Sequence, residues 1–100
     1  MIIRGGFNIF PVELERVLLE DPRIQEASII GIPHERLGEV PKAYIVAEEG
    51  ETITKEDVLE ISRTKTAKFK AIEDVEIVDA SFFPRNALGK VMKVELKKRL

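Results

Sequence analysis

The 100-residue sequence contains no cysteine and only one histidine, His34. The absence of cysteine excludes a disulfide scaffold, a cysteine nucleophile and a Cys-based zinc site, and it agrees with a reducing compartment. No apolar run approaches the roughly 18 residues that a membrane-spanning helix needs. The N-terminus also lacks the basic leader and the small-residue cleavage site of a signal peptide. We therefore expect a cytoplasmic protein with no transmembrane segment.

Hydrophobic residues make up 44% of the sequence and charged residues 34%. This balance is typical of a water-soluble globular fold and unlike that of a disordered chain. The length suits one hydrophobic core, so we predict a single domain over residues 1–100. That size suits a complete binding module but is small for an enzyme that acts on two substrates.

Positive charge is concentrated in the second half of the chain. Residues 1–50 hold five basic and nine acidic residues, whereas residues 51–100 hold eleven and nine. The surplus lies in two clusters, namely Arg63, Lys65, Lys68 and Lys70, and Arg85, Lys90, Lys93, Lys97, Lys98 and Arg99. Such clusters suit an anionic ligand, but a solvated helix face with cations near its C-terminus has the same composition. Charge alone leaves both interpretations open.

The spacing of apolar residues predicts alternating strands and helices. The pair Gly5-Gly6 lies between short apolar runs and indicates a tight turn, and Pro11 suits the first position of a helix. Thr54 with Asp57 three residues later indicates a capped second helix that runs towards residue 67. Further predicted elements are strands over 24–32, 40–47 and about 75–78, and a terminal helix over 91–100. This order predicts an α+β fold, a small antiparallel or mixed sheet with about three helices packed on it.

The pair Gly89-Lys90 prompts a test for a phosphate-binding P-loop. That motif requires glycine at position 84 and serine or threonine at position 91, but the sequence has Pro84 and Val91. No zinc-protease motif, hydrolase elbow or carboxylate metal loop is present either, and we expect no metal site in this chain. A lysine on a turn is usually solvated, yet the compact ammonium of Lys90 is well suited to phosphate oxygens.

Several segments, taken in order, resemble the C-terminal domain of adenylate-forming enzymes, specifically acyl-CoA synthetases. Residues 84–90 resemble the terminal P-x-x-x-x-G-K motif of that family, and residues 1–15 resemble the opening of the domain. The run from Gly5 to Pro11 is similar to that of a fatty-acid or carboxylic-acid:CoA ligase. The segments between them that follow the family's order are 18–22, 31–33, 38–43 and 67–70.

The resemblance implies a reaction in two halves. A carboxylate attacks the α-phosphate of ATP to give an acyl-adenylate and pyrophosphate, and the thiol of CoA then displaces AMP. It implies that Lys90 enters the active site for the first half. It also implies that Gly89, beside Lys90, contacts the bound cofactor. The face of Arg4, Gly5 and Gly6 would line the path of the pantetheine of CoA in the second, where a side chain would obstruct the thiol.

The resemblance also implies partners for this chain. A larger N-terminal adenylation domain of the same parent chain would hold the carboxylic acid, most of the ATP and CoA, and Mg²⁺. The isolated domain would then be inactive, and the parent enzyme would be a long- or medium-chain fatty acid:CoA ligase. The family's hinge residue would lie just upstream of Met1.

Three features depart from the family pattern. Ala71 stands where proline is usual, Leu88 replaces a small hydroxyl residue, and residues 80–83 make the approach to the motif one or two residues longer. The altered Leu88, together with a hinge residue that is absent from this sequence, leaves an alternative function open, namely a standalone binding or regulatory module that keeps the fold without the reaction. Nucleic-acid binding through residues 85–100 is disfavoured, because the net charge is −2 and no aromatic residues alternate with the basic ones.

Overall fold

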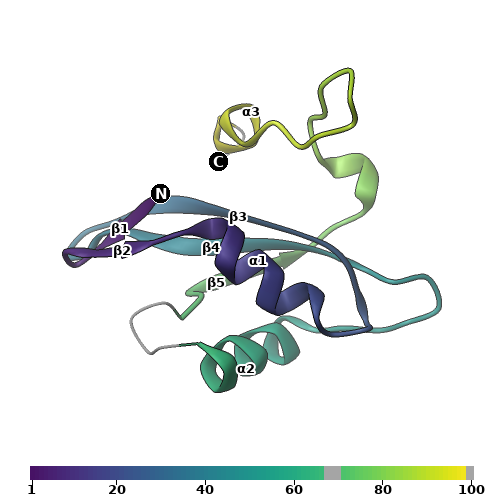
Figure 1. The fold of residues 1–100 in the computed structure, drawn as a ribbon, viewed down its shortest axis with the longest axis horizontal. Coiled ribbons are helices and arrows are strands. Elements are labelled where there is room, and N and C mark those ends of the chain that lie inside the picture. Colours follow the sequence, from purple (N-terminus) through teal and green to yellow (C-terminus); the bar gives the residue numbers. More distant parts are fainter. Residues whose placement is uncertain (67–70, 99–100) are drawn as a thin grey trace.

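The computed structural model describes residues 1–66 and 71–98, and it has a single sheet with helices on both faces (Figure 1). The strands are β1 (Ile2–Arg4), β2 (Phe7–Ile9), β3 (Ile24–His34), β4 (Gly38–Ala47) and β5 (Asp74–Ile77). The helices are α1 (Pro11–Leu19), α2 (Lys55–Lys65), α3 (Lys93–Lys97) and a 3-10 turn, η2 (Ala80–Phe82). This architecture confirms the predicted α+β fold. No helix in the described part of the chain is long and apolar enough to cross a membrane.

Strand β4 is the centre of the sheet. It pairs antiparallel with β3 along one edge, from Gly38 opposite His34 to Ala47 opposite Ile24. On its other edge it meets β1, where Arg4 lies opposite Gly38, and then pairs in parallel with β5. The parallel pairing follows from the crossover of α2 between β4 and β5. The ends of β1 and β5 therefore share one edge of β4.

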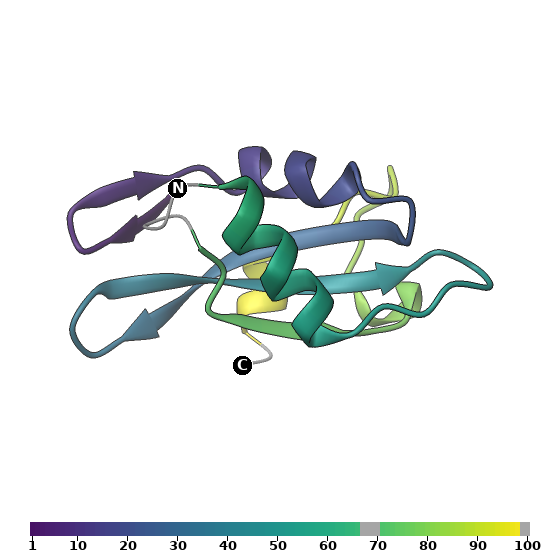
Figure 2. The ribbon, with the colours of Figure 1, turned by 90° about the horizontal axis from the view of Figure 1, so that it is seen from below.

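Alternation along the strands divides the apolar side chains between the two faces of the sheet, because successive side chains of a strand point to opposite sides. On β4, Ala43 and Ile45 pack in the core with α1 and α2, whereas Tyr44 and Val46 pack with Phe83 and Leu96. Figure 2 shows α1 and α2 together on the near face, with α3 behind the sheet. The second, smaller core thus fixes the C-terminal segment on the opposite face.

Local signals in the sequence set the helix ends. Pro11 opens α1, and Thr54 caps α2 by accepting a hydrogen bond from the Asp57 N–H at 3.1 Å while Asp57 accepts one from the Thr54 N–H at 3.0 Å. Both predictions are confirmed. The predicted terminal helix was too long at its start, since Val91 pairs with Arg85 in an isolated antiparallel bridge and α3 begins at residue 93. Residues 67, 99 and 100, to which helices were also extended, lie outside the described residues.

Asp21, just after α1, gives a testable dependence of stability on pH. Its carboxylate accepts hydrogen bonds from the Arg23 side chain and from the Arg23 N–H, and these lower the pKa of Asp21 from 3.8 to about 2. The lowered pKa means that the ionised carboxylate stabilises the fold fully above about pH 4 and loses this contribution as the pH falls towards 2. Asp21→Asn should therefore cost about 1–2 kcal/mol at pH 7 and less at acid pH.

Urea unfolding at a series of pH values measures this difference. Glu60→Gln, which removes the exposed ion pair with Arg63, is the matched control and should change stability little at any pH. Unfolding free energies for Asp21→Asn and the unsubstituted chain that differ by the same amount from pH 7 to pH 2 would contradict the assignment.

Candidate functional site: two glycine-bearing turns

The turn between β1 and β2 consists of two residues, Gly5 and Gly6, because Arg4 lies directly opposite Phe7. Their φ values are +54° and +87°. These are the left-handed conformations required in a two-residue turn whose twist matches that of the two strands it joins. A Cβ at position 5 would lie 3.1 Å from Cδ2 of Leu37, whereas a Cβ at position 6 would have no atom within 4 Å. Gly6 is therefore the residue of the pair that faces open space.

The tip of the β3–β4 hairpin supports this turn. The Gly5 N–H donates a hydrogen bond of 2.8 Å to the Leu37 carbonyl oxygen, and the two hairpin tips lie side by side in Figure 2. His34 shapes the same tip, since its Nδ1 accepts hydrogen bonds from the N–H groups of Arg36 and Leu37. The lone histidine thus stabilises the β3–β4 turn, to which Gly5 is hydrogen-bonded.

Arg4 points back into the domain. Its Nη1 donates to the Ala71 carbonyl oxygen at 2.8 Å, and its Nη2 forms an ion pair with Glu73. The side chain of Arg4 is only 16% exposed. These contacts are possible because β1 and the approach to β5 share one edge of β4. Arg4 therefore ties the base of the glycine turn to the sheet, and sequence reasoning did not identify Ala71 and Glu73 as its partners.

The turn that carries Lys90 is closed by its own hydrogen bonds. The side-chain oxygen of Asn86 accepts from the N–H groups of Leu88 at 2.9 Å and Lys90 at 3.0 Å. The Asn86 N–H donates to the Lys90 carbonyl oxygen, and the Gly89 N–H donates to that of Asn86, both at 2.9 Å. Gly89 has a φ of +80°, which permits the return of the chain. Asn86 thereby holds residues 86–90 as one rigid unit, a role that sequence reasoning missed although an Asn beside a Pro-Arg opening is a turn signal.

Most described cations of the basic cluster at the C-terminal end form ion pairs with carboxylates of the same domain. Among the described residues, the ion pairs there are Arg85–Glu26, Lys93–Glu15, Lys97–Glu39 and Lys98–Glu95. The side chain of Lys90 is exposed and has no ion-pair or hydrogen-bond partner within residues 1–66 and 71–98. Lys68, Lys70 and Arg99, which belong to the predicted basic clusters, lie outside the described residues. Lys90 is thus the cation of the described cluster that remains available to a ligand.

The structure does not bring the two turns together. The β1–β2 turn lies at one end of the molecule, and the loop between η2 and α3 lies towards the other, in both views (Figures 1 and 2). The longest dimension of the fold is 38 Å. In one fixed orientation against a second domain, this domain could not bring both turns to the same reaction centre.

The described residues contain no group of three or more histidine, cysteine, aspartate or glutamate side chains that could hold a metal ion. Neither glycine turn offers carboxylate oxygens of the kind that Mg²⁺ prefers.

Comparisons with known proteins identify the family of this chain. Residues 13–90 match the family described as the AMP-binding enzyme C-terminal domain. The chain is 43% identical to a 3-[(3aS,4S,7aS)-7a-methyl-1,5-dioxo-octahydro-1H-inden-4-yl]propanoyl:CoA ligase of Rhodococcus jostii, over 97% of this chain and 18% of that protein. It is 35% identical to the long-chain-fatty-acid–CoA ligase FadD13 of Mycobacterium tuberculosis, over 99% of this chain and 19% of that protein.

A solved structure supports the same conclusion. Apo MatB from Rhodopseudomonas palustris matches with a TM-score of 0.88 and 39% identity, over 97% of this chain and 19% of the MatB chain. The fold is that of a C-terminal domain of an adenylate-forming enzyme. This chain belongs to the AMP-binding enzyme C-terminal domain family, as found in acyl-CoA ligases, and it spans about a fifth of the length of the curated relatives it matches.

Proposed function

We propose that residues 1–100 are the mobile C-terminal lid domain of an AMP-forming acyl-CoA synthetase. The parent enzyme would convert a carboxylic acid, ATP and CoA to acyl-CoA, AMP and pyrophosphate. The observation that carries the proposal is the similarity of nearly the whole chain to acyl-CoA ligases of which it spans only 18 to 19%. The larger remainder of the parent would hold the acid, most of the ATP and CoA, and Mg²⁺.

Each half-reaction would use one of the two turns. In the first half, Lys90 would place its ammonium against the oxygens that gain negative charge as the carboxylate attacks the α-phosphate, with Gly89 allowing a close approach. In the second half, the domain would rotate and bring the face of Arg4, Gly5 and Gly6 to the pantetheine path. Within that face, Gly6 would border the path, whereas Arg4 would hold the turn through Ala71 and Glu73.

The separation of the two turns supports this alternation. A rigid domain whose two functional turns lie far apart would have to reorient in order to use both at one reaction centre. We further propose a fatty acid of long or medium chain as the substrate, because the relative FadD13 is named a long-chain-fatty-acid–CoA ligase and the mouse relative ACSF2 a medium-chain acyl-CoA ligase. A cytoplasmic location stays a prediction of the sequence.

Expression of the parent gene tests the proposal. The full-length chain should form acyl-CoA, AMP and pyrophosphate from a panel of fatty acids with ATP and CoA, as measured by coupled release of AMP and by chromatography of the thioester. Residues 1–100 alone should form none. A gene that encodes nothing beyond this domain, together with binding of a ligand by the isolated chain, would instead support the standalone module.

A further inference from the structure

We propose that Arg85, held by Glu26, is a positioning residue that sets the orientation of the Lys90 turn for acyl-adenylate formation. The inference rests on the proposed function, since it assigns Lys90 to that half-reaction. It concerns a residue that does not touch the substrate and acts through the turn that it anchors.

The guanidinium of Arg85 joins three separate parts of the fold. Its Nη2 lies 2.8 and 2.9 Å from the two carboxylate oxygens of Glu26 on β3, and 3.2 Å from the carbonyl oxygen of Ala80 at the start of η2. Its Nη1 donates to the carbonyl oxygen of Gly89 at 3.2 Å. Gly89 is the residue directly before Lys90, so one side chain connects the edge strand β3 to the point where Lys90 leaves the turn.

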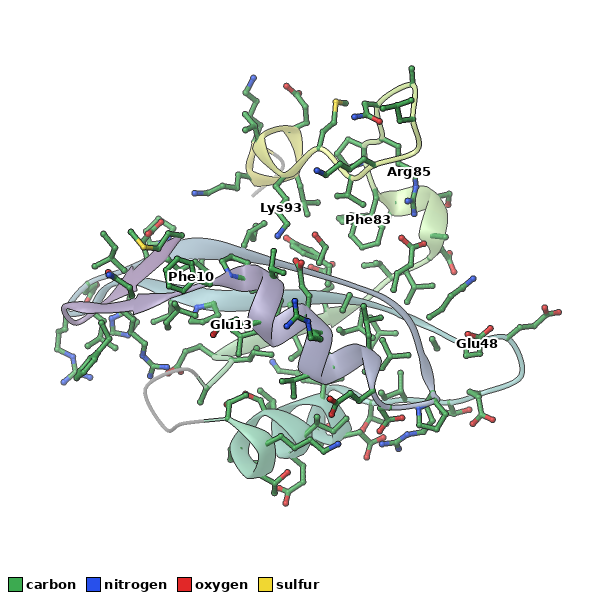
Figure 3. All side chains as sticks on the ribbon, in the orientation of Figure 1. Phe10, Glu13, Glu48, Phe83, Arg85 and Lys93 are labelled. Atoms are coloured by element: carbon green, nitrogen blue, oxygen red, sulfur yellow. The ribbon has the colours of Figure 1, made fainter. Side chains whose placement is uncertain are left out.

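An aromatic ring also contacts the Arg85 guanidinium. The central carbon of the Arg85 guanidinium lies 5.5 Å from the ring centre of Phe83, which suits a cation–π contact. Phe83 is buried and packs edge-on against Tyr44 of β4 at 6.5 Å, and Phe82 stacks on the same tyrosine at 5.3 Å. Figure 3 shows Phe83 and Arg85 adjacent on the segment between η2 and α3. The guanidinium is thus held between a carboxylate and a buried ring.

These contacts matter to Lys90 because the turn is rigid but projects from the sheet. Asn86 closes residues 86–90 on themselves, so the direction of Lys90 depends on how the base of the turn is attached. At that base, Arg85 pairs with Val91 across the turn, and the Met92 N–H donates to the Pro84 carbonyl oxygen at 2.7 Å. Both links lie within the projecting segment itself. The contact between Arg85 and Glu26 is the ion pair that connects this segment to β3.

The side chains of Arg85 and Glu26 are 31% and 30% exposed. The pair is therefore open enough to tolerate substitution without loss of the fold, yet shielded enough to hold one geometry. A lysine at position 85 would keep the charge but could not reach Glu26, Ala80 and Gly89 together, because an ammonium is a single point of donation rather than a planar fork.

The experiment uses the full-length parent enzyme with Arg85→Gln, Arg85→Lys and Glu26→Gln. Acyl-adenylate formation is followed by pyrophosphate exchange, and thioester formation is followed from supplied acyl-adenylate and CoA. Arg85→Gln should lower kcat of adenylation about 10- to 100-fold, since displacements near 1 Å at a catalytic group have effects of that size. The KM for ATP and the rate of thioester formation should stay within about twofold, because binding contacts are retained.

The other variants separate positioning from general stability. Arg85→Lys should recover part of the adenylation rate, and Glu26→Gln should lower it in the same half-reaction. The double variant should be no slower than Arg85→Gln alone, because the two residues act through one contact. Arg63→Gln, which removes an arginine from an exposed ion pair on α2, is the matched control and should affect neither step. If Arg85→Gln does not fold, as judged by circular dichroism, Arg85→Lys and Glu26→Gln decide the question.

Lys90→Ala is measured alongside. Retention of adenylation by Lys90→Ala would overturn the proposed function of Lys90 and this inference with it. Loss of adenylation in Lys90→Ala beside full activity in Arg85→Gln, Arg85→Lys and Glu26→Gln would overturn the inference alone. Equal losses of both half-reactions in the folded Arg85 variants would also overturn it, since they would indicate a general structural role.

Discussion

Lys90→Ala in the full-length parent enzyme should reduce acyl-adenylate formation about 100- to 1000-fold, the usual cost of removing one group that stabilises developing charge. The side chain is exposed and unpaired among the described residues, so its loss leaves no buried charge and no broken contact within the domain. Thioester formation from supplied acyl-adenylate should remain, because a different face would serve that step. Pyrophosphate exchange and thioester chromatography measure the two rates separately.

The matched control is Lys98→Ala. Lys98 lies on the same C-terminal segment and pairs with Glu95 three residues before it on the surface, so its removal deletes one positive charge without touching the turn. It should leave both half-reactions unchanged. An equal loss of both steps in Lys90→Ala, or a comparable loss in Lys98→Ala, would show that charge or stability and not the position of Lys90 is responsible.

Gly6→Leu should have the opposite effect and impair thioester formation by at least about tenfold, because a misplaced or obstructed thiol loses the near-attack geometry. A Cβ at position 6 meets no atom of the domain within 4 Å, so the leucine would extend into the space through which pantetheine is proposed to pass. Adenylation should be spared. Gly5→Leu should also impair the step, but there the side chain would strike Leu37 as well.

Gly50→Leu is the control for the backbone. Gly50 has a φ of +80°, close to the +87° of Gly6, and a Cβ there also meets no atom within 4 Å. Both substitutions therefore carry a similar conformational penalty, but Gly50 lies in the turn after β4, at the other end of that strand from the glycine hairpin. Unimpaired thioester formation in Gly6→Leu, or an equal defect in Gly50→Leu, would count against the proposed path.

Much of the secondary structure follows from short-range rules. Pro11, the capping residues Thr54 and Asp57, and the glycine pair act on their immediate neighbours, and each produced the element that it predicts. The start of α3 was less predictable. Val91 is compatible with a helix, but its pairing with Arg85 across the turn holds it in an extended conformation.

The candidate site divides in the same way. Lys90, Gly89 and the Gly5–Gly6 pair are recognisable because a motif of fixed spacing is a local property of the chain. The role of Asn86 could have been predicted from the sequence, since its side-chain hydrogen bonds stay within its own turn. The partners of the two arginines were not, because Glu73 is 69 residues from Arg4 and Glu26 is 59 residues from Arg85.

By itself, the sequence determined the class of fold, the resemblance to the family and the positions of the two turns that we propose to carry the chemistry, because these depend on residue type and on spacing along the chain. Only the tertiary structure decided that the turns lie towards opposite ends of the domain. It also decided that Gly6 rather than Gly5 faces open space, and that most described lysines and arginines near the C-terminal end are neutralised by carboxylates from other elements. These properties depend on which strand edges and faces meet, and such distances are fixed only when β4 has paired with its three neighbours.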